Sequence, residues 1–194
     1  MVREFAPGIE VPPEPPPTPP TFLKRHLVTL GLALAGGVFA ILGAFIEEMR
    51  GGAGILLAVV VAPVIEEVLK PSGVIWVLEK RPHYLRSRVH VVALCVVGAL
   101  VFATLENLVY LYVYAPGGGA GFARFRLLVC TGLHVTASAV VGMGLGRQLL
   151  QMRRDGSDFD LERSLPFLIA AIVLHGAYNA AVSILEMVGW KPWT

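Results

Sequence analysis

The sequence predicts an all-α membrane protein, a polytopic bundle of about five transmembrane helices around a buried polar pocket. Of the 194 residues, 55% are hydrophobic and only 15% are charged, and the mean hydropathy is +0.68. The apolar residues gather in five runs, each close to the roughly 20 residues that cross a bilayer as a helix. Ionisable residues interrupt four of these runs, although a charge inside a bilayer costs about 2.5–3.5 kcal/mol on insertion scales. Such residues need a shared polar environment.

Composition also excludes some classes of function. The formal net charge of +2 is too small to indicate a nucleic-acid partner, and no basic helix with interleaved aromatic residues supports one. The two cysteines, Cys95 and Cys130, both lie in apolar runs. We interpret them as small core residues rather than as a disulfide framework.

The chain divides into a tail and one membrane domain. Residues 1–21 are rich in proline and cannot bury a core, so they predict a disordered cytoplasmic tail. Residues 22–194 form the transmembrane helical domain, with no internal repeat and no second domain. The apolar runs predict helices over about 27–46, 54–78, 89–114, 122–150 and 165–188.

The second run differs from the others because two prolines disturb its backbone hydrogen bonding. Pro71 has no N–H, so the carbonyl of Glu67 loses its helical partner, and Pro63 does the same to Val59. Free backbone groups at membrane depth are tolerated only inside protein or beside a wet cavity. We therefore expect a break or kink in this helix, next to its carboxylates.

The basic residues before and between the runs set the expected orientation of the chain in the membrane. With the N-terminus in the cytoplasm, eleven Lys and Arg residues lie on the cytoplasmic side: Arg3, Lys24, Arg25, Lys80, Arg81, Arg86, Arg88, Arg147, Arg153, Arg154 and Arg163. The opposite side holds four: Arg50, Arg124, Arg126 and Lys191. The outer helix ends also carry the aromatic residues of a membrane belt: Tyr110, Tyr112, Tyr114, Trp190 and Trp193. The C-terminus is therefore expected outside.

Helical spacing pairs the polar residues of the last four runs. The pairs are Glu66 and Glu67 with Lys70, Phe102 with Glu106 (next to Asn107), His134 with Ser138, and His175 with Asn179. At about 1.5 Å per residue, Glu66, His134 and His175 each lie roughly 18 Å from the outer end of their run, and Glu106 roughly 12 Å. A common depth predicts one polar pocket. It argues against an ion pathway, whose acidic groups would follow the membrane normal.

No single pair is decisive, because a buried histidine is often a packing residue and Ser or Asn often joins two helices. The combination is more specific. Three acidic residues outside this combination lie at helix ends near water, so no function has to be assigned to them: Glu47, Glu48 and Glu186.

A carboxylate, two histidines and an amide in a pocket that excludes water suit hydrolysis. In a metal-free version Glu66 deprotonates a water, while Glu67 and Lys70 orient and balance it. His175 and Asn179 then donate to the developing oxyanion. Glu66 and Glu67 point about 100° apart on a helix, so the spacing alone leaves open which of them faces the pocket.

In a metal-assisted version, His134, His175 and either Glu66 or Glu106 hold Zn²⁺ and leave a position open for water. A second glutamate is then the base, and Glu106 is otherwise a second acid. The chain has no H-E-x-x-H motif, so the ligands would come from separate helices. Both versions stay open.

The four motifs together resemble those of the PrsW family of intramembrane proteases. They are Glu66-Glu67-x-x-Lys70, Phe102-x-x-x-Glu106-Asn107, His134-x-x-x-Ser138 and His175-x-x-x-Asn179, on the second to fifth helices in order. The family belongs to a superfamily with the CAAX prenyl proteases and bacteriocin-processing enzymes. In the CAAX branch the first motif ends in Arg and the second in His, whereas here they end in Lys70 and in Glu106-Asn107.

The resemblance implies a peptidase that cleaves a single-pass or lipidated membrane protein, with anti-sigma factors as the type known in bacteria. It implies Glu66 or Glu67 in water activation, with His134, His175 and Asn179 around the scissile carbonyl. PrsW proteins are described as metalloproteases and the CAAX relatives resemble glutamate-dependent enzymes, so Zn²⁺ stays open. The expected location, among membrane lipids, is a bacterial or archaeal cytoplasmic membrane. Because the superfamily includes the scaffold subunit of gamma-secretase, a non-catalytic scaffold or substrate-binding subunit is the alternative.

Overall fold

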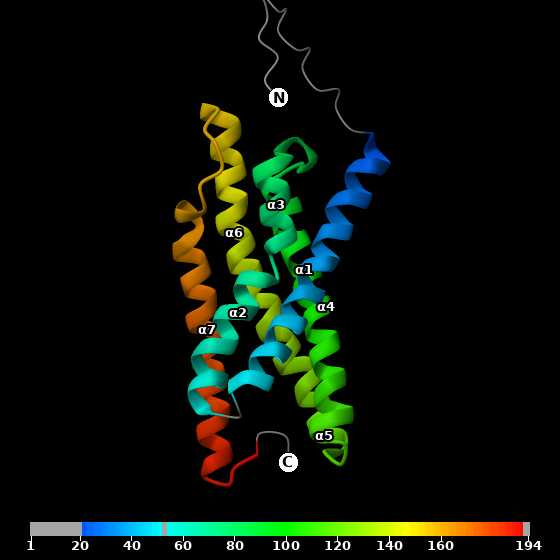
Figure 1. The fold of residues 1–194 in the computed structure, drawn as a ribbon, viewed down its shortest axis with the longest axis vertical. Helices are drawn as coiled ribbons and strands as arrows, with labels where there is room; N and C mark the ends of the chain where they lie inside the picture. Colours follow the sequence, from blue (N-terminus) through cyan, green and yellow to red (C-terminus); the bar gives the residue numbers. More distant parts are fainter. Residues whose placement is uncertain (1–20, 52–53, 192–194) are drawn as a thin grey trace, which may run out of the picture.

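The structure is a computed structural model that describes residues 21–51 and 54–191. The predicted proline-rich tail lies outside these residues, apart from Thr21. In chain order the elements are α1 (Phe22–Gly51), η1 (Leu57–Val61), α2 (Ala62–Leu69), α3 (Ser72–Lys80), η2 (Pro82–Tyr84), α4 (Arg88–Val109), η3 (Tyr110–Tyr114), α5 (Gly119–Phe125), η4 (Arg126–Cys130), α6 (Thr131–Asp155), η5 (Leu161–Ser164) and α7 (Leu165–Met187). The described residues contain no strand, and the predicted all-α bundle is confirmed (Figure 1).

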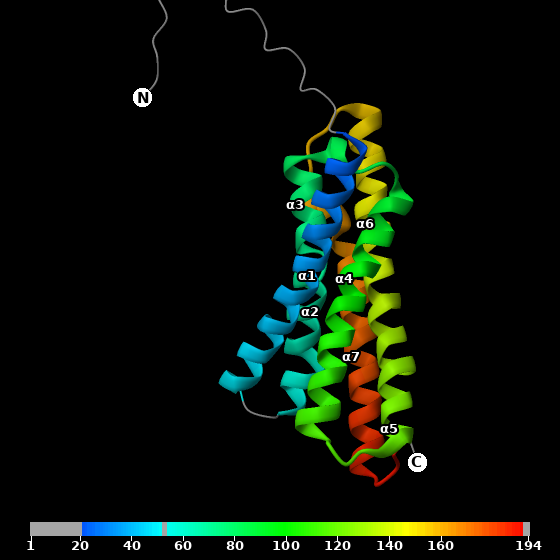
Figure 2. The same cartoon turned by 90° about the vertical axis from the view of Figure 1, so that its right-hand side faces the viewer.

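Among the residues that the structure describes, four helical segments are long and apolar enough to cross a membrane, against the five or so predicted: Phe22–Ile46, Arg88–Tyr114, Gly119–Asp155 and Leu161–Met187. They correspond to the first, third, fourth and fifth predicted runs. Three of the elements, η1, η3 and η4, are π-helical turns, which hold one more residue per turn than an α-helix. The connections α3–α4 and α6–α7 lie at the end of the bundle where α1 begins, and α7 finishes at the opposite end (Figures 1 and 2).

The second predicted run is not one continuous helix. It is divided into α2 and α3, which follow one another along the bundle, and the division falls at Lys70 and Pro71 (Figure 1). The break that the prolines predict in the helix over about 54–78 is therefore present. At the break Pro71 has φ −85° and ψ 0°, and its carbonyl accepts from the N–H of Ile75 at 2.9 Å to start α3.

Glycines let neighbouring helices approach this break closely. A Cβ at Gly36 of α1 would lie 2.4 Å from the carbonyl oxygen of Lys70, and one at Gly98 of α4 would lie 2.9 Å from the same atom. Any larger residue would meet backbone there, so α1 and α4 pack against the break only because these positions are glycine. The break is thus held from two sides.

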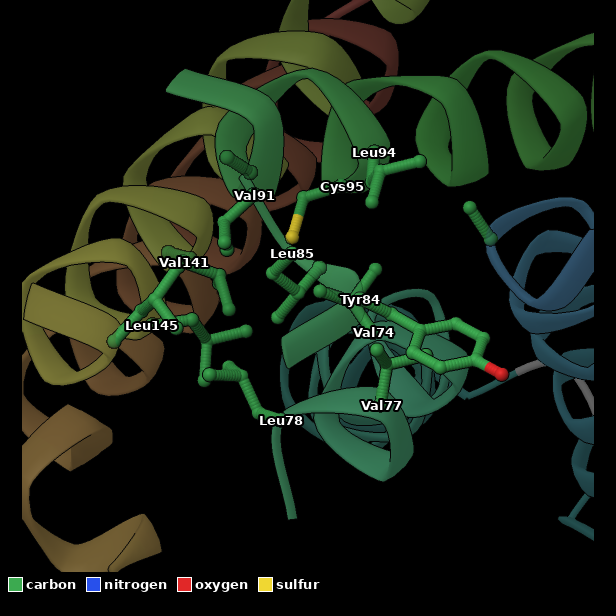
Figure 3. Packing of buried hydrophobic residues seen from close by; sticks show 14 residues of the cluster. Val74, Val77, Leu78, Tyr84, Leu85, Val91, Leu94, Cys95, Val141 and Leu145 are labelled. Carbon is green, nitrogen blue, oxygen red and sulfur yellow. The ribbon is translucent and has the colours of Figure 1, made fainter. Parts of the chain in front are cut away.

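The apolar core lies on the α3 side of the break (Figure 3). Val77 and Leu78 of α3 pack there with Val91 of α4 and with Leu145 of α6, all of them fully buried. The Arg153 guanidinium donates to the carbonyls of Leu85 and Arg86 and ties α6 to the α3–α4 connection. On the α2 side the interior is polar instead.

The exposure pattern is that of an integral membrane protein. Large apolar side chains such as Leu27, Leu128 and Val173 are more than 60% exposed, whereas Glu67 and Lys70 are fully buried. A bilayer favours apolar side chains on the outside and confines charge to the interior of the bundle. The protein is therefore embedded in a membrane, among lipids.

Candidate active site

Four acidic and histidine side chains meet just before the break in the second run. Glu66 and Glu67 come from α2, His134 from α6 and His175 from α7, and all four are at most 4% exposed. One ligand atom from each lies within 4.8 Å of the others. Residues that are far apart in the sequence are therefore brought into one buried cluster, with the Lys70 ammonium among them.

Glu67 anchors one side of this cluster. Its Oε1 accepts from the Lys70 ammonium at 2.6 Å and from His175 Nδ1 at 2.8 Å. A carboxylate oxygen only accepts, so Nδ1 of His175 carries a hydrogen and its Nε2 is the nitrogen left to face the cluster. Glu67 therefore fixes both the orientation and the tautomer of His175.

His134 is fixed in a similar way from the other side. The Lys70 ammonium donates to its Nδ1 at 3.2 Å, and its Nε2 donates to Glu106 Oε2 at 3.0 Å. The ring of Phe102 packs against the imidazole at 4.9 Å between centroids, and the ammonium lies 4.8 Å from the centroid of the same ring. The predicted pair of Phe102 and Glu106 thus surrounds His134.

Arg126 is a site residue that the sequence analysis missed. It was predicted on the outer surface, but it is only 8% exposed and its Nη2 donates to Glu106 Oε2 at 2.6 Å. Its Nε donates to Asn107 Oδ1 at 3.0 Å, and Asn107 donates in turn to Thr131 at 3.0 Å. The signal that could have found it is a cation four residues inside the apolar run over 122–150, on the same outer half of the membrane as Glu106.

Glu66, and not Glu67, faces open space. A cavity of about 210 Å³ is lined by Glu66 together with Glu106, Arg126, His134 and His175. A single water needs only about 10–15 Å³ on this scale, so several waters fit. Glu66 Oε2 has no hydrogen-bond partner among the described residues. A buried acceptor without a donor is costly, so this atom calls for a water or a cation.

Asn179 lies on the cavity wall but does not bond to His175. Its Nδ2 donates to the carbonyl of Ala58 at 2.8 Å. That carbonyl is free because the N–H of Ala62 pairs with Leu57 in the π-helical turn and because Pro63 has no N–H. Pro63 was predicted to free the carbonyl of Val59. With the π-helical turn before it, Pro63 also leaves the carbonyl of Ala58 free, and this carbonyl holds Asn179.

Gly176 explains how α7 comes so near this wall. A Cβ at Gly176 would lie 2.4 Å from the carbonyl oxygen of Val59, which is the group that Pro63 was predicted to free. Ser138, the partner of His134 in its motif, is buried, but its Oγ bonds to no group in the described part of the chain.

The two cysteines are free and buried, as expected, and Cys130 contacts the Tyr178 hydroxyl at 3.2 Å.

Both histidines have the arrangement of metal ligands. Histidines that bind a metal commonly donate their other N–H to a carboxylate, as His134 does to Glu106 and His175 to Glu67. Their remaining nitrogens, His134 Nδ1 and His175 Nε2, lie 3.9 Å and 3.8 Å from Glu66 Oε2.

These separations suit a divalent cation. Ligand atoms about 2.0–2.1 Å from a tetrahedral zinc lie about 3.3–3.5 Å from one another, so a small inward movement would complete the set. Glu66, His134 and His175 therefore fit a metal, and of the two predicted glutamate alternatives the geometry favours Glu66. Glu106 is not among the four residues whose ligand atoms lie together, and its Oε2 is already bonded by His134 and Arg126. For His134 Nδ1 to bind a metal, its hydrogen bond from the Lys70 ammonium would have to break.

Comparison with known families supports a protease. The sequence model of the PrsW family intramembrane metalloproteases matches residues 21–191, nearly the whole chain and every residue of the cluster. Comparisons with curated proteins and with solved structures gave no match.

Proposed function

The chain belongs to the PrsW family of intramembrane metalloproteases, and from that premise we propose that it hydrolyses a peptide bond at the cavity lined by Glu66. Family membership makes the protein an intramembrane peptidase that acts on membrane proteins. The observation that carries the proposed site is Glu66 Oε2, a buried acceptor with no hydrogen-bond partner among the described residues, beside a cavity large enough for water.

The roles follow from the contacts. Glu66 holds the attacking water and takes its proton, while the water oxygen bonds to the scissile carbonyl carbon. The proton then passes to the leaving amide nitrogen as the C–N bond breaks, which returns Glu66 to its starting state. The Glu67–Lys70 pair balances the charge of Glu66, because the ammonium lies 3.9 Å from Glu66 Oε2.

Asn179 is assigned to the developing oxyanion. Only one of its two amide hydrogens is used by Ala58, and the side chain lines the cavity. A positioned amide donor that stabilises an oxyanion is commonly worth about 10²–10³ in rate.

A divalent ion such as Zn²⁺, held by Glu66, His134 and His175, would polarise the carbonyl and make a bound water more acidic. The fit of the three ligand atoms supports this assignment, and Glu66 would then be a ligand rather than the base. Glu67 would orient His175 from behind, and Glu106, which orients His134 and also lines the cavity, would be the second glutamate that takes the proton from the water. Arg126 would in turn hold Glu106 in place.

The orientation and the substrate are also part of the proposal. The basic residues of the α3–α4 and α6–α7 connections lie at the end where α1 begins, which supports a cytoplasmic N-terminus. Arg126 is buried against Glu106, so it is left out of the count of basic residues on the outer side of the membrane. The family resemblance supports a bacterial or archaeal cytoplasmic membrane and a single-pass or lipidated substrate of the anti-sigma-factor type, acted on by a membrane domain over residues 22–194.

A non-catalytic scaffold is the second candidate, and one observation favours it. The Lys70 ammonium, within hydrogen-bond distance of both Glu67 and His134, already supplies a cation to the cluster. In a scaffold these contacts would only hold α2, α6 and α7 together.

Cleavage of reporters separates the two candidates. The protein is reconstituted in liposomes with a panel of tagged single-pass and lipid-anchored membrane proteins, and products are followed on gels. We expect Glu66→Gln to abolish cleavage and to leave the melting temperature in detergent nearly unchanged, with Glu79→Gln, an exposed carboxylate, as the matched control. Turnover that persists in Glu66→Gln would remove Glu66 from the mechanism.

A further inference from the structure

The cavity beside Glu66 continues into a larger groove. The groove has a volume of about 860 Å³ and shares with the cavity the residues Ala58, Ala62, Glu66, Glu106, Tyr110, Ser183 and Glu186. Its far side is formed by Ile41, Leu42 and Phe45 of α1. The groove therefore connects the lipid-facing end of α1 with the carboxylate of the proposed site.

The shape of α1 explains why the groove exists. As far as Gly43, α1 lies against the second run, and a Cβ at Gly43 would lie 2.5 Å from a methyl carbon of Leu69. Beyond this glycine, Phe45 and Ile46 are about half exposed. Figure 2 shows the same end of α1 standing away from the other helices. On the opposite side Ala58 and Ala62 present only small side chains, so space remains between the two walls.

The lining indicates what the groove accepts. Leu42, Phe45 and Met187 supply apolar surface at its sides, while Glu66, Glu106 and Glu186 supply acidic groups. An anionic lipid headgroup would be repelled by these carboxylates, and an acyl chain would offer no donor to Glu66 Oε2. A peptide offers both apolar side chains and N–H donors.

We propose that this groove, between the C-terminal third of α1 and the ends of α4 and α7, is where the substrate docks as one apolar membrane segment that is unwound near the cleaved bond. The inference rests on the proposed function, because the groove leads to Glu66. Unwinding is required for a carbonyl to reach Glu66, and backbone that has lost its helical hydrogen bonds is tolerated at membrane depth when it lies in a cavity of the protein.

Photocrosslinking tests the groove without requiring cleavage. Benzoylphenylalanine replaces either Phe45 or Phe39 in full-length Glu66→Gln protein. Both positions are phenylalanines on α1 with similar exposure, 51% and 57%, and only Phe45 lines the groove. The probe is a single-pass peptide of Leu and Ala with a central Gly-Gly pair and terminal lysines, reconstituted in the same liposomes.

We expect the probe to be captured at position 45 at least tenfold more than at position 39. Equal capture at the two positions, or a lipid adduct alone at position 45, would overturn the proposal. In the active protein, Leu42→Trp should reduce reporter cleavage at least tenfold by filling the groove, while Leu34→Trp, on α1 but outside the groove, should not.

The two proposals fail in different ways. If position 45 captures the probe and the wild-type protein cleaves no reporter, the groove stands and the protease assignment falls. If cleavage is observed and position 45 captures no more probe than position 39, only the groove is wrong.

Discussion

Replacing Arg126 by Gln is expected to destabilise the protein because it leaves Glu106 buried without its cation. The guanidinium makes two side-chain hydrogen bonds, at 2.6 Å to Glu106 and at 3.0 Å to Asn107, and the two charged side chains are only 10% and 17% exposed. Breaking a buried ion pair by removing one partner costs about 3–5 kcal/mol. Water in the neighbouring cavity screens part of this interaction, so we expect about 3 kcal/mol, at the low end.

The assay is reversible unfolding in mixed micelles, with Arg124→Gln as the matched control. Arg124 lies two residues earlier and is exposed, so its replacement should change the free energy of unfolding by no more than about 0.5 kcal/mol. In the double variant Arg126→Gln with Glu106→Gln, the lone buried charge is gone, and part of the stability should return. A loss in Arg126→Gln that does not exceed the loss in Arg124→Gln would refute the assigned ion pair.

Three further predictions concern the metal, the packing and the oxyanion. Purified with zinc supplied and without chelator, the wild-type protein should hold about one zinc per chain and a folded His175→Ala variant almost none, as measured by elemental analysis; zinc in neither sample would favour the carboxylate mechanism or the scaffold. Gly36→Ala should lower the free energy of unfolding by about 1–3 kcal/mol, because its Cβ meets the Lys70 carbonyl, whereas Gly31→Ala, with open space around it, should not lower it. Asn179→Ala should reduce the rate of reporter cleavage about 10²-fold at equal amounts of folded protein, and an unchanged rate would exclude Asn179 from the oxyanion site.

The sequence predicted the features that depend on local chemistry. The break at Pro71 follows from a missing N–H, which acts within one turn wherever the helix lies. The meeting of Glu66, His134 and His175 follows from the cost of leaving each of them in lipid. Neither prediction requires knowledge of how the helices rotate.

The features that could not be predicted from the sequence depend on how each helix is rotated about its own axis. Arg126 was counted among the basic residues on the outer side of the membrane, from its position near the end of an apolar run, whereas here its side chain points toward Glu106. The choice between Glu66 and Glu67 was open for the same reason, since it is decided by which face α2 presents to the cavity. The contact of Asn179 with the Ala58 carbonyl depends on a π-helical turn, and no spacing of residues in the sequence predicts such a turn.

The three π-helical turns affect how sequences of this kind should be aligned. Each turn contributes to the cavity wall, η1 through Ala58, η3 through Tyr110 and η4 through Arg126 and Cys130. Of the three, η4 lies directly between two α-helices, α5 and α6. Removing one residue from η4 would restore an α-helix and rotate α5 by about 100° relative to α6. A one-residue gap at η4 therefore changes which side chains of α5 face the cavity, even where the motifs of α6 align perfectly.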